Sequence, residues 1–265
     1  MPDAPAHDRA FVRLADDSRV EDHAAVAEEV PVAFVYSGRP HVVMMCSPEN
    51  LEDLAYGFSL TEGIVTGTSE IERVEQSKHA KGFELAITIP VEAAARLAQR
   101  TRALAGRTGC GLCGVEAIDE AVRAVRVVQS ALTLSTDALW RAGEALEAHQ
   151  PVNRETRSVH AAAWATADGT LVVAREDVGR HNALDKVLGA LARAGTDASS
   201  GFLVVTSRAS FELVQKASAA GVALLAAVSR PTGLAIKIAD ASGITLVGLL
   251  RGRTANVYSH PERIT

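Results

Sequence analysis

Apolar residues in the second half of the chain come in short runs that alternate with amphipathic segments. The runs predict buried strands at residues 202–206, 222–228 and 244–250. The segment before each run has the length and spacing of a helix, at residues 182–194, 210–220 and 232–239. Because strands this apolar are usually covered on both faces, the alternation predicts an α/β fold with a largely parallel sheet and helices on both sides.

The first half of the chain shows shorter elements in a different order. Residues 30–45 predict two strands around a turn at Ser37-Gly38-Arg39-Pro40. Ser47-Pro48 predicts the start of a helix, with Ser47 as its N-cap. A second strand pair and an alanine-rich helix are predicted at 71–76, 83–89 and 91–105. Together these elements predict a small α+β unit.

Between the halves lies a glycine-rich stretch, and after it come a helix at 135–149 and a hairpin across Asp168-Gly169. The organisation that we predict has four parts. They are a flexible leader (1–20), an N-terminal α+β domain (21–105), a cysteine loop and connector (106–130) and a C-terminal α/β domain (131–265).

Composition narrows the class of protein. The chain has 265 residues, 48% of them hydrophobic, which is enough to bury a substantial core. Its net charge of −5 argues against a general nucleic-acid binder, which would carry a basic excess. No apolar run reaches the roughly 18 residues that a membrane span needs, and the polar N-terminus lacks the apolar core of a signal peptide. With only three cysteines, we expect a cytoplasmic protein that binds neither membranes nor nucleic acid.

The stretch Gly109-Cys110-Gly111-Leu112-Cys113-Gly114 holds two of the three cysteines. It lacks the bulk to pack into a core, and its glycines leave the backbone permissive. Arg107 precedes the pair, and a nearby cation favours the thiolate, the form that attacks and carries sulfur. The stretch therefore points to sulfur or metal chemistry.

Four interpretations of this cysteine pair compete. The first is a turn with two idle thiols. The second, structural zinc, normally needs four ligands, but Cys46 is remote in sequence and no second cysteine pair exists, so we predict no metal site. The third, a thioredoxin-like redox motif, would directly follow a strand, whereas this pair follows a predicted helix. The fourth, which we favour, is a loop that accepts sulfur as a persulfide on one thiol and passes it on.

Arginines recur where the predicted strands end. The hairpin strand runs into the segment 175–182, and the later strands end in Ser207-Arg208, Ser229-Arg230 and Arg251-Gly252-Arg253. Ligands of open α/β sheets bind outside the carboxyl ends of the strands. Serine hydroxyls, guanidinium groups and helix N-termini there would form an anion-binding crevice.

Several single residues remain open to two interpretations. His181-Asn182 either caps the following helix or, with Asp177 and Asp185, supplies acid–base chemistry. We expect His160, which lies in an apolar segment, to be a core histidine, and Cys46 to be buried.

Four motifs occur in one order along the chain and together resemble a known family. They are Cys110-Gly111-Leu112-Cys113, the segment 176–186 (EDVGRHNALDK), Ser207-Arg208, and Arg251-Gly252-Arg253 with Asn256-Val257-Tyr258. The chain closely resembles the formate dehydrogenase accessory sulfurtransferase family, FdhD, from about Val30 onward, including Leu60-Thr61-Glu62-Gly63-Ile64. The 176–186 segment is specific, whereas the cysteine spacing alone would be weak.

The resemblance implies a sulfur carrier with a cytidine-deaminase-like fold that forms a homodimer. Its partners would be a cysteine desulfurase and formate dehydrogenase. Its substrate would be the molybdenum cofactor, Mo-bis(molybdopterin guanine dinucleotide), with guanine nucleotide as a partial mimic. Cys110 would carry the persulfide, and Cys113 would assist. The expected cofactor contacts are Gly248, Leu249, Leu250, Arg251, Gly252, Arg253, Arg208, Ser229, Arg230 and His181.

The deaminase chemistry itself is not expected. His160 has Ala162 where the zinc signature needs glutamate, and the cysteine pair precedes the histidine. Three other functions remain as alternatives to the sulfurtransferase: a non-catalytic cofactor-binding chaperone, a zinc-dependent hydrolase and a dithiol oxidoreductase.

Overall fold

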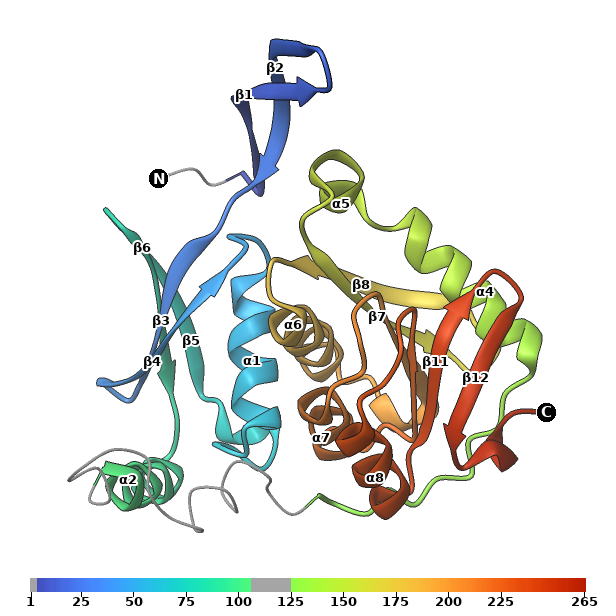
Figure 1. Cartoon of the computed structure of the whole chain (residues 1–265). Helices are drawn as coiled ribbons and strands as arrows, with labels where there is room; N and C mark the ends of the chain where they lie inside the picture. Colours follow the sequence, from blue (N-terminus) through green and yellow to red (C-terminus); the bar gives the residue numbers. More distant parts are fainter. Residues whose placement is uncertain (1–3, 106–124) are drawn as a thin grey trace.

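The structure, a computed structural model, describes residues 4–105 and 125–265, in three sheets and the helices packed on them (Figure 1). The smaller of the two main sheets has the strand order β4-β3-β6-β5, and the larger has the order β12-β11-β10-β9-β7-β8. A two-stranded hairpin, β1-β2, projects from this body. Within the described residues, no helix is long and apolar enough to cross a bilayer.

The four-stranded sheet confirms the strand pairs predicted for the first half. Its strands are β3 (Val30–Tyr36), β4 (Arg39–Cys46), β5 (Arg73–His79) and β6 (Gly82–Thr88). Residues of β3 are buried and partly exposed in alternation, as expected for a sheet with one covered face. The covering element is α1 (Leu51–Thr61), and the predicted helix α2 (Val91–Ala105) follows β6.

The six-stranded sheet is mixed, so the prediction of a largely parallel sheet is wrong. Its strands are β7 (His160–Thr166), β8 (Leu171–Asp177), β9 (Gly201–Val205), β10 (Leu224–Ala227), β11 (Thr245–Arg251) and β12 (Thr254–Ser259). Only β9, β10 and β11 run parallel as neighbours; β7 pairs antiparallel with β8 and β9, and β12 with β11. The parallel centre is what the alternating apolar runs indicated. The antiparallel strands β7 and β12 make the sheet mixed within the predicted α/β class.

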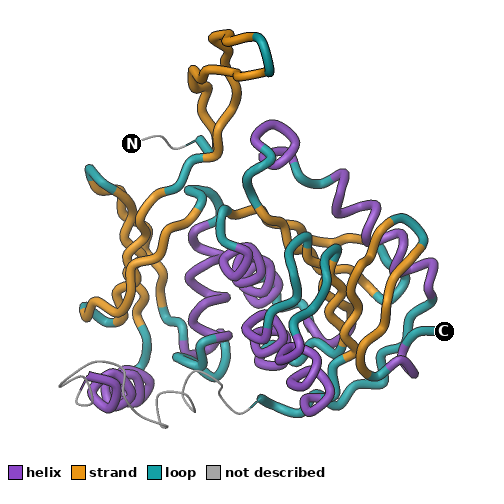
Figure 2. Tube along the Cα trace, in the orientation of Figure 1, coloured by secondary structure: helices purple, strands orange, loops and turns teal. Residues whose placement is uncertain are grey.

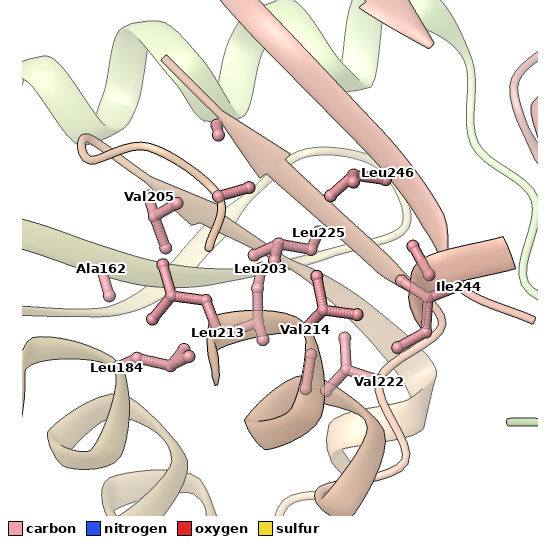
Figure 3. Packing of buried hydrophobic residues seen from close by; sticks show 14 of the residues in the cluster. Ala162, Leu184, Leu203, Val205, Leu213, Val214, Val222, Leu225, Ile244 and Leu246 are labelled. Atoms are coloured by element: carbon pink, nitrogen blue, oxygen red, sulfur yellow. The ribbon is translucent and has the colours of Figure 1, made fainter. Parts of the chain in front are cut away.

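Helices cover both faces of this sheet, as predicted. One face packs against α4 (Thr136–Ala148), and the other against α6 (Arg180–Arg193), α7 (Phe211–Ala219) and α8 (Gly233–Ser242). Figure 3 shows Leu203 and Leu225 of the sheet meeting Leu213 and Val214 of α7. The short helix α5 (Pro151–Thr156) precedes β7, and 3₁₀ turns lie at Thr68–Glu70, Ala198–Ser200 and Pro261–Arg263.

The segment expected to be a flexible leader contains most of a hairpin. Strands β1 (Ala6–Ala15) and β2 (Ser18–Ala27) pair along their whole length around a two-residue turn. Figure 2 shows the hairpin standing apart from the two larger sheets. The prolines and charges near the N-terminus suggested a frayed end, but the prolines precede β1 and the charges lie on exposed strand faces.

Helix α1 also begins later than predicted. The first helical residue is Leu51, after Asn50 in the left-handed region with φ 55°. Ser47 is not a cap: its hydroxyl accepts a hydrogen bond from the N–H of Val178, at the end of β8 (3.1 Å). The Ser47 side chain thus makes a tertiary contact instead of the N-cap bond that the local sequence predicts.

Helices α1 and α6 lie side by side between the two main sheets, and glycines set their separation (Figure 1). A methyl group added to Gly57 of α1 would stand 1.8 Å from the backbone oxygen of Asp185. One added to Gly189 of α6 would stand 1.8 Å from the backbone oxygen of Asp53. Each helix therefore presents a glycine where the other helix's backbone comes closest.

We predict that Gly57→Ala destabilises the fold by at least about 2 kcal/mol, because the helices must separate to admit the methyl group. The measurement is the free energy of unfolding in urea. Gly233→Ala is the matched control, since a methyl group there meets nothing within 4 Å. It should be neutral or stabilising by up to about 1 kcal/mol. Equal effects of the two substitutions would contradict the close-packing account.

Candidate functional site

The carboxyl ends of four strands lie along one edge of the six-stranded sheet. Strands β9, β10 and β11 are parallel, and β8 runs the same way because it and β9 are both antiparallel to β7. The segments that carry the predicted anion-binding residues leave the sheet at this edge. The structure therefore brings Arg208, Ser229-Arg230 and the 248–253 segment to one rim, with His181 on the α6 segment that follows β8.

Backbone contacts join two of these segments directly. Leu249 has φ 55°, unusual for a residue other than glycine, and its N–H donates to the carbonyl oxygen of Ser229 (3.2 Å). Arg251 Nε donates to the carbonyl oxygen of Val228 (3.3 Å). Gly248 lies so close to Pro231 that an added methyl group would stand 2.7 Å from the proline ring. The bulge in β11 is thus fixed against the end of β10.

Not every predicted contact faces this rim. Leu250 is buried in the cluster beneath α4, on the opposite face from α6. Arg253 is exposed, but its guanidinium pairs with Asp137 in the first turn of α4. Gly252, with φ 53°, forms the turn between β11 and β12, and Arg251 and Arg230 are exposed. Leu250 therefore faces away from this rim and Arg253 pairs with α4, and their contact with a cofactor stays a prediction.

Arg175 was also expected at the crevice, but it lies at the junction between two lobes. One lobe is the four-stranded sheet with α1 and α2, and the other is the six-stranded sheet with its helices. The guanidinium Nη2 of Arg175 lies 2.8 Å from Asp53 of α1, and Arg193 Nη1 lies 2.6 Å from the same carboxylate. Asp53 is 5% exposed, so two cations neutralise a buried charge. Arg175 is thereby engaged in holding α1 to the six-stranded sheet.

A cationic cluster forms at the start of α6 and consists of His160, Arg180, His181 and Arg208. Burial, then the charges of Arg180, Arg208 and His181, lower the pKa of His160. The Nε atom of Arg180 is buried and has no hydrogen-bond partner within the described residues. The predicted core histidine thus lies half-buried among cations. His160 and Arg180 were not among the predicted site residues, although Arg180 lies inside the specific 176–186 motif.

Beside the cationic cluster lies a cleft of about 520 Å³ between the two lobes. His181 lines it, and His181 Nε2 lies 2.9 Å from Glu212 Oε2. Apolar side chains from both lobes complete the walls, among them Met44, Phe58 and Phe211. Sequence reasoning missed Glu212, because its partner His181 is thirty-one residues away along the chain.

The acidic residues of the 176–186 motif are structural. Asp177 Oδ2 lies 2.6 Å from Lys186 Nζ, with both side chains fully buried. The same carboxylate accepts the N–H groups of Ser47 (3.0 Å) and Gly179 (2.8 Å) and the side-chain amide of Asn182 (3.0 Å). Asp177 therefore fixes the end of β4 to the start of α6.

A second buried network joins the Leu60-Thr61-Glu62 segment to the same motif. Lys216 Nζ of α7 lies 2.9 Å from Asp185 and 3.0 Å from Glu62, and Thr61 donates to Asp185 (2.7 Å). Burial alone would lower the pKa of Lys216, but the charges of Asp185 and Glu62 raise it overall. Lys216 therefore stays protonated as part of the framework.

The cysteine pair Cys110 and Cys113 lies outside the described residues. Val125 and Arg126, the first described residues after the cysteine pair, line the cleft. Ser218 of α7 donates a hydrogen bond to the carbonyl oxygen of Arg126 (2.6 Å). Cys46 is buried, as predicted, and burial raises the pKa of its thiol far above the usual range. Among the described residues no His/Cys/Asp/Glu cluster could hold a metal ion, and the prediction for the cysteine pair itself stays untested.

Comparison with known proteins decides the family. The FdhD/NarQ family model matches residues 27–265. The chain belongs to the FdhD/NarQ family. It is 54% identical over 239 residues to the sulfur carrier protein FdhD of Xanthomonas axonopodis pv. citri (strain 306), covering 90% of this chain and 85% of that protein. The sulfur carrier protein FdhD of Bordetella bronchiseptica is 49% identical over 243 residues, covering 92% of this chain and 87% of the relative. The predicted resemblance is confirmed.

A crystal structure supports the fold. It is described as that of a formate dehydrogenase accessory protein from Desulfotalea psychrophila and superposes with a TM-score of 0.79, covering 99% of this chain and 100% of that one. At 24% identity this likeness bears on the fold alone. The cytidine-deaminase-like detail remains a prediction.

We predict that Lys186→Met destabilises the protein by about 3–5 kcal/mol, because it leaves the Asp177 carboxylate buried without its cation. Urea unfolding measures this loss. Lys237→Met, an exposed lysine of α8, is the matched control and should stay within about 0.5 kcal/mol of the parent. A loss below about 1 kcal/mol for Lys186→Met would show that the buried pair does not hold the junction.

Proposed function

We propose that this protein accepts sulfur from a cysteine desulfurase as a persulfide on Cys110, assisted by Cys113, and transfers it to Mo-bis(molybdopterin guanine dinucleotide). Delivery would precede insertion of the cofactor into formate dehydrogenase, and the protein would act as a cytoplasmic homodimer. The observation that carries the proposal is about 50% identity to sulfur carrier proteins across nearly the whole chain. The described residues support it through the chemistry of the rim.

Phosphate groups suit the cationic cluster. A pyrophosphate needs several N–H donors and a positive field, and guanidinium groups supply both. Arg180 Nε is a buried donor with no partner in the described residues, and such a group costs free energy unless it finds an acceptor. Helix α6 follows Gly179, an N-cap residue without a side chain, so the first N–H groups of the helix add to the positive field.

The bulged segment 248–251 supports a contact with the nucleotide portion of the cofactor. Leu249 is held in a left-handed conformation by its bond to Ser229, and strained backbone of this kind concentrates at binding sites. The segment lies at the same edge as the cationic cluster. A dinucleotide cofactor with phosphates on the cationic cluster and a base toward the bulge would follow this edge of the sheet.

Sulfur uptake is a thiol–persulfide exchange. A thiolate of the acceptor attacks the outer sulfur of the donor persulfide, a new S–S bond forms, the donor S–S bond breaks, and the donor leaves as a thiolate. No net oxidation occurs. Arg107, which precedes the pair in sequence, is a cation of the kind that favours the attacking thiolate.

We predict that incubation with a cysteine desulfurase and cysteine adds one sulfur atom to Cys110 or Cys113, mapped by mass spectrometry of the peptides. The double variant Cys110→Ala with Cys113→Ala should gain none. Cys46→Ala should gain sulfur like the parent, because the Cys46 thiol is buried and its raised pKa keeps it protonated. An unlabelled parent protein, or full formate dehydrogenase activity in cells carrying the double variant, would favour the non-catalytic chaperone instead.

We predict that Arg208→Gln weakens the binding of guanosine diphosphate at least about tenfold, since one charge-assisted hydrogen bond is lost. Calorimetry at fixed ionic strength measures the dissociation constant. Arg19→Gln on the exposed hairpin removes the same charge far from the rim and should leave it unchanged. Equal affinities for parent and Arg208→Gln would place the nucleotide elsewhere.

A further inference from the structure

The cleft between the lobes contains a carboxylate–imidazole pair that phosphate binding does not require. Glu212 Oε2 lies 2.9 Å from His181 Nε2 and also accepts a hydrogen bond from Ser210 Oγ (3.1 Å). Glu212 lies in the first turn of α7, where the helix dipole favours a negative charge. A carboxylate held in this way fixes the orientation and tautomer of the imidazole that it contacts. With Nε2 bonded to Glu212, Nδ1 is the ring nitrogen left to exchange a proton.

The surrounding charges single out His181 as the proton-exchanging group of the cleft. Lys216 and Asp185, which also line it, are paired with each other in the buried network. Arg180 and His160 face the imidazole from α6 and β7 and, like Lys216, oppose its protonation; Glu212 favours it. Burial is the largest influence, and the pKa of His181 falls below its ordinary value. The imidazole is therefore neutral near pH 7 and able to accept a proton.

Beside its charged groups, the cleft has an apolar wall that suits a thiol or persulfide. Met44, Phe58 and Phe211 supply apolar and polarisable surface, which sulfur tolerates well. The volume, about 520 Å³, fits the tip of a peptide loop or a small persulfide. His181 also belongs to the cationic cluster, so the cleft opens beside the rim proposed for the cofactor.

We infer that this cleft admits the cysteine persulfide of the sulfur donor, and that His181, positioned by Glu212, accepts the proton of the thiol that attacks it. This inference rests on the proposed function. Val125 in the cleft wall follows Cys113 by twelve positions, a length of chain that spans at most about 40 Å. The cleft is thus within the reach of the accepting thiols.

The proton and sulfur movements balance. The acceptor S–H bond breaks as its proton passes to His181 Nδ1, and the resulting thiolate forms a bond to the outer sulfur of the donor. The donor S–S bond breaks, and its leaving thiolate takes the proton back from the imidazolium. His181 ends the step as it began, and no external oxidant or reductant takes part. His181 would be a catalytic residue and Glu212 a positioning residue.

The test is the rate of sulfur uptake from glutathione persulfide between about pH 5 and 9, followed by rapid quench and mass spectrometry. For the parent, the rate should rise with pH to a plateau, and the midpoint of the rise should lie below the ordinary histidine pKa of about 6.5. In His181→Gln the midpoint of this rise should move to about pH 8.5, the ordinary pKa of a thiol that has no general base beside it. The rate of uptake at pH 7 should therefore fall about 30-fold.

The variant Glu212→Gln distinguishes a Glu212 that positions His181 from one that only stabilises the fold. Because the Glu212 charge raises the pKa of His181, its removal should shift the rise by about one pH unit toward acid. Glu147→Gln on α4 and His79→Gln at the end of β5 make the same chemical changes at exposed sites and should leave the profile unaltered. Added imidazole should restore part of the rate in His181→Ala.

Two negative results have different meanings. If His181→Gln and Glu212→Gln are folded by circular dichroism and keep the parent pH profile, the inference is wrong and the persulfide function stands. If the parent takes up no sulfur on either thiol at any pH, the proposed function itself fails.

Discussion

Close packing of two helices through glycine is the constraint on which the rest of the structure depends. Because Gly57 and Gly189 let the backbones of α1 and α6 meet, little room remains for large apolar side chains between them. The junction is completed instead by buried ion pairs around Asp53, Asp177 and Asp185. Buried pairs of this kind cost desolvation and tolerate few geometries, so they fix one arrangement of the lobes. Both the cleft and the cationic cluster depend on that arrangement.

The 176–186 motif serves two purposes at once. Its inward side chains, such as Asp177 and Lys186, hold α6 against the end of β4. Arg180 and His181, in contrast, belong to the cationic cluster, and His181 also lines the cleft. The framework therefore positions the chemical groups within a single turn of helix. A substitution on the inward side would displace the outward side chains even if it left their identities intact. This explains why one stretch of the sequence is so distinctive.

The sequence predicted what local patterns determine and missed what distant contacts determine. Apolar periodicity located most of the helices and strands but not β1, β2, β12 or α5. The arginines at the predicted strand ends gather at one edge of the six-stranded sheet. The antiparallel strand β12 was missed, because it carries too few apolar residues to be recognised. Arg175 and Arg253 form ion pairs with acidic residues far along the chain, and no local pattern reveals those partners. Glu212 was missed for the same reason: nothing near it in sequence marks it as a partner of His181.

The β1-β2 hairpin pairs only with itself and adds no strand to either larger sheet. The part of the chain that the family model matches starts at residue 27, where this hairpin ends. The match to the family model therefore rests on the two larger sheets and their helices, without the hairpin. Because the hairpin shares no hydrogen-bonded ladder with the two larger sheets, its sequence can vary without altering the strand pairing of either one.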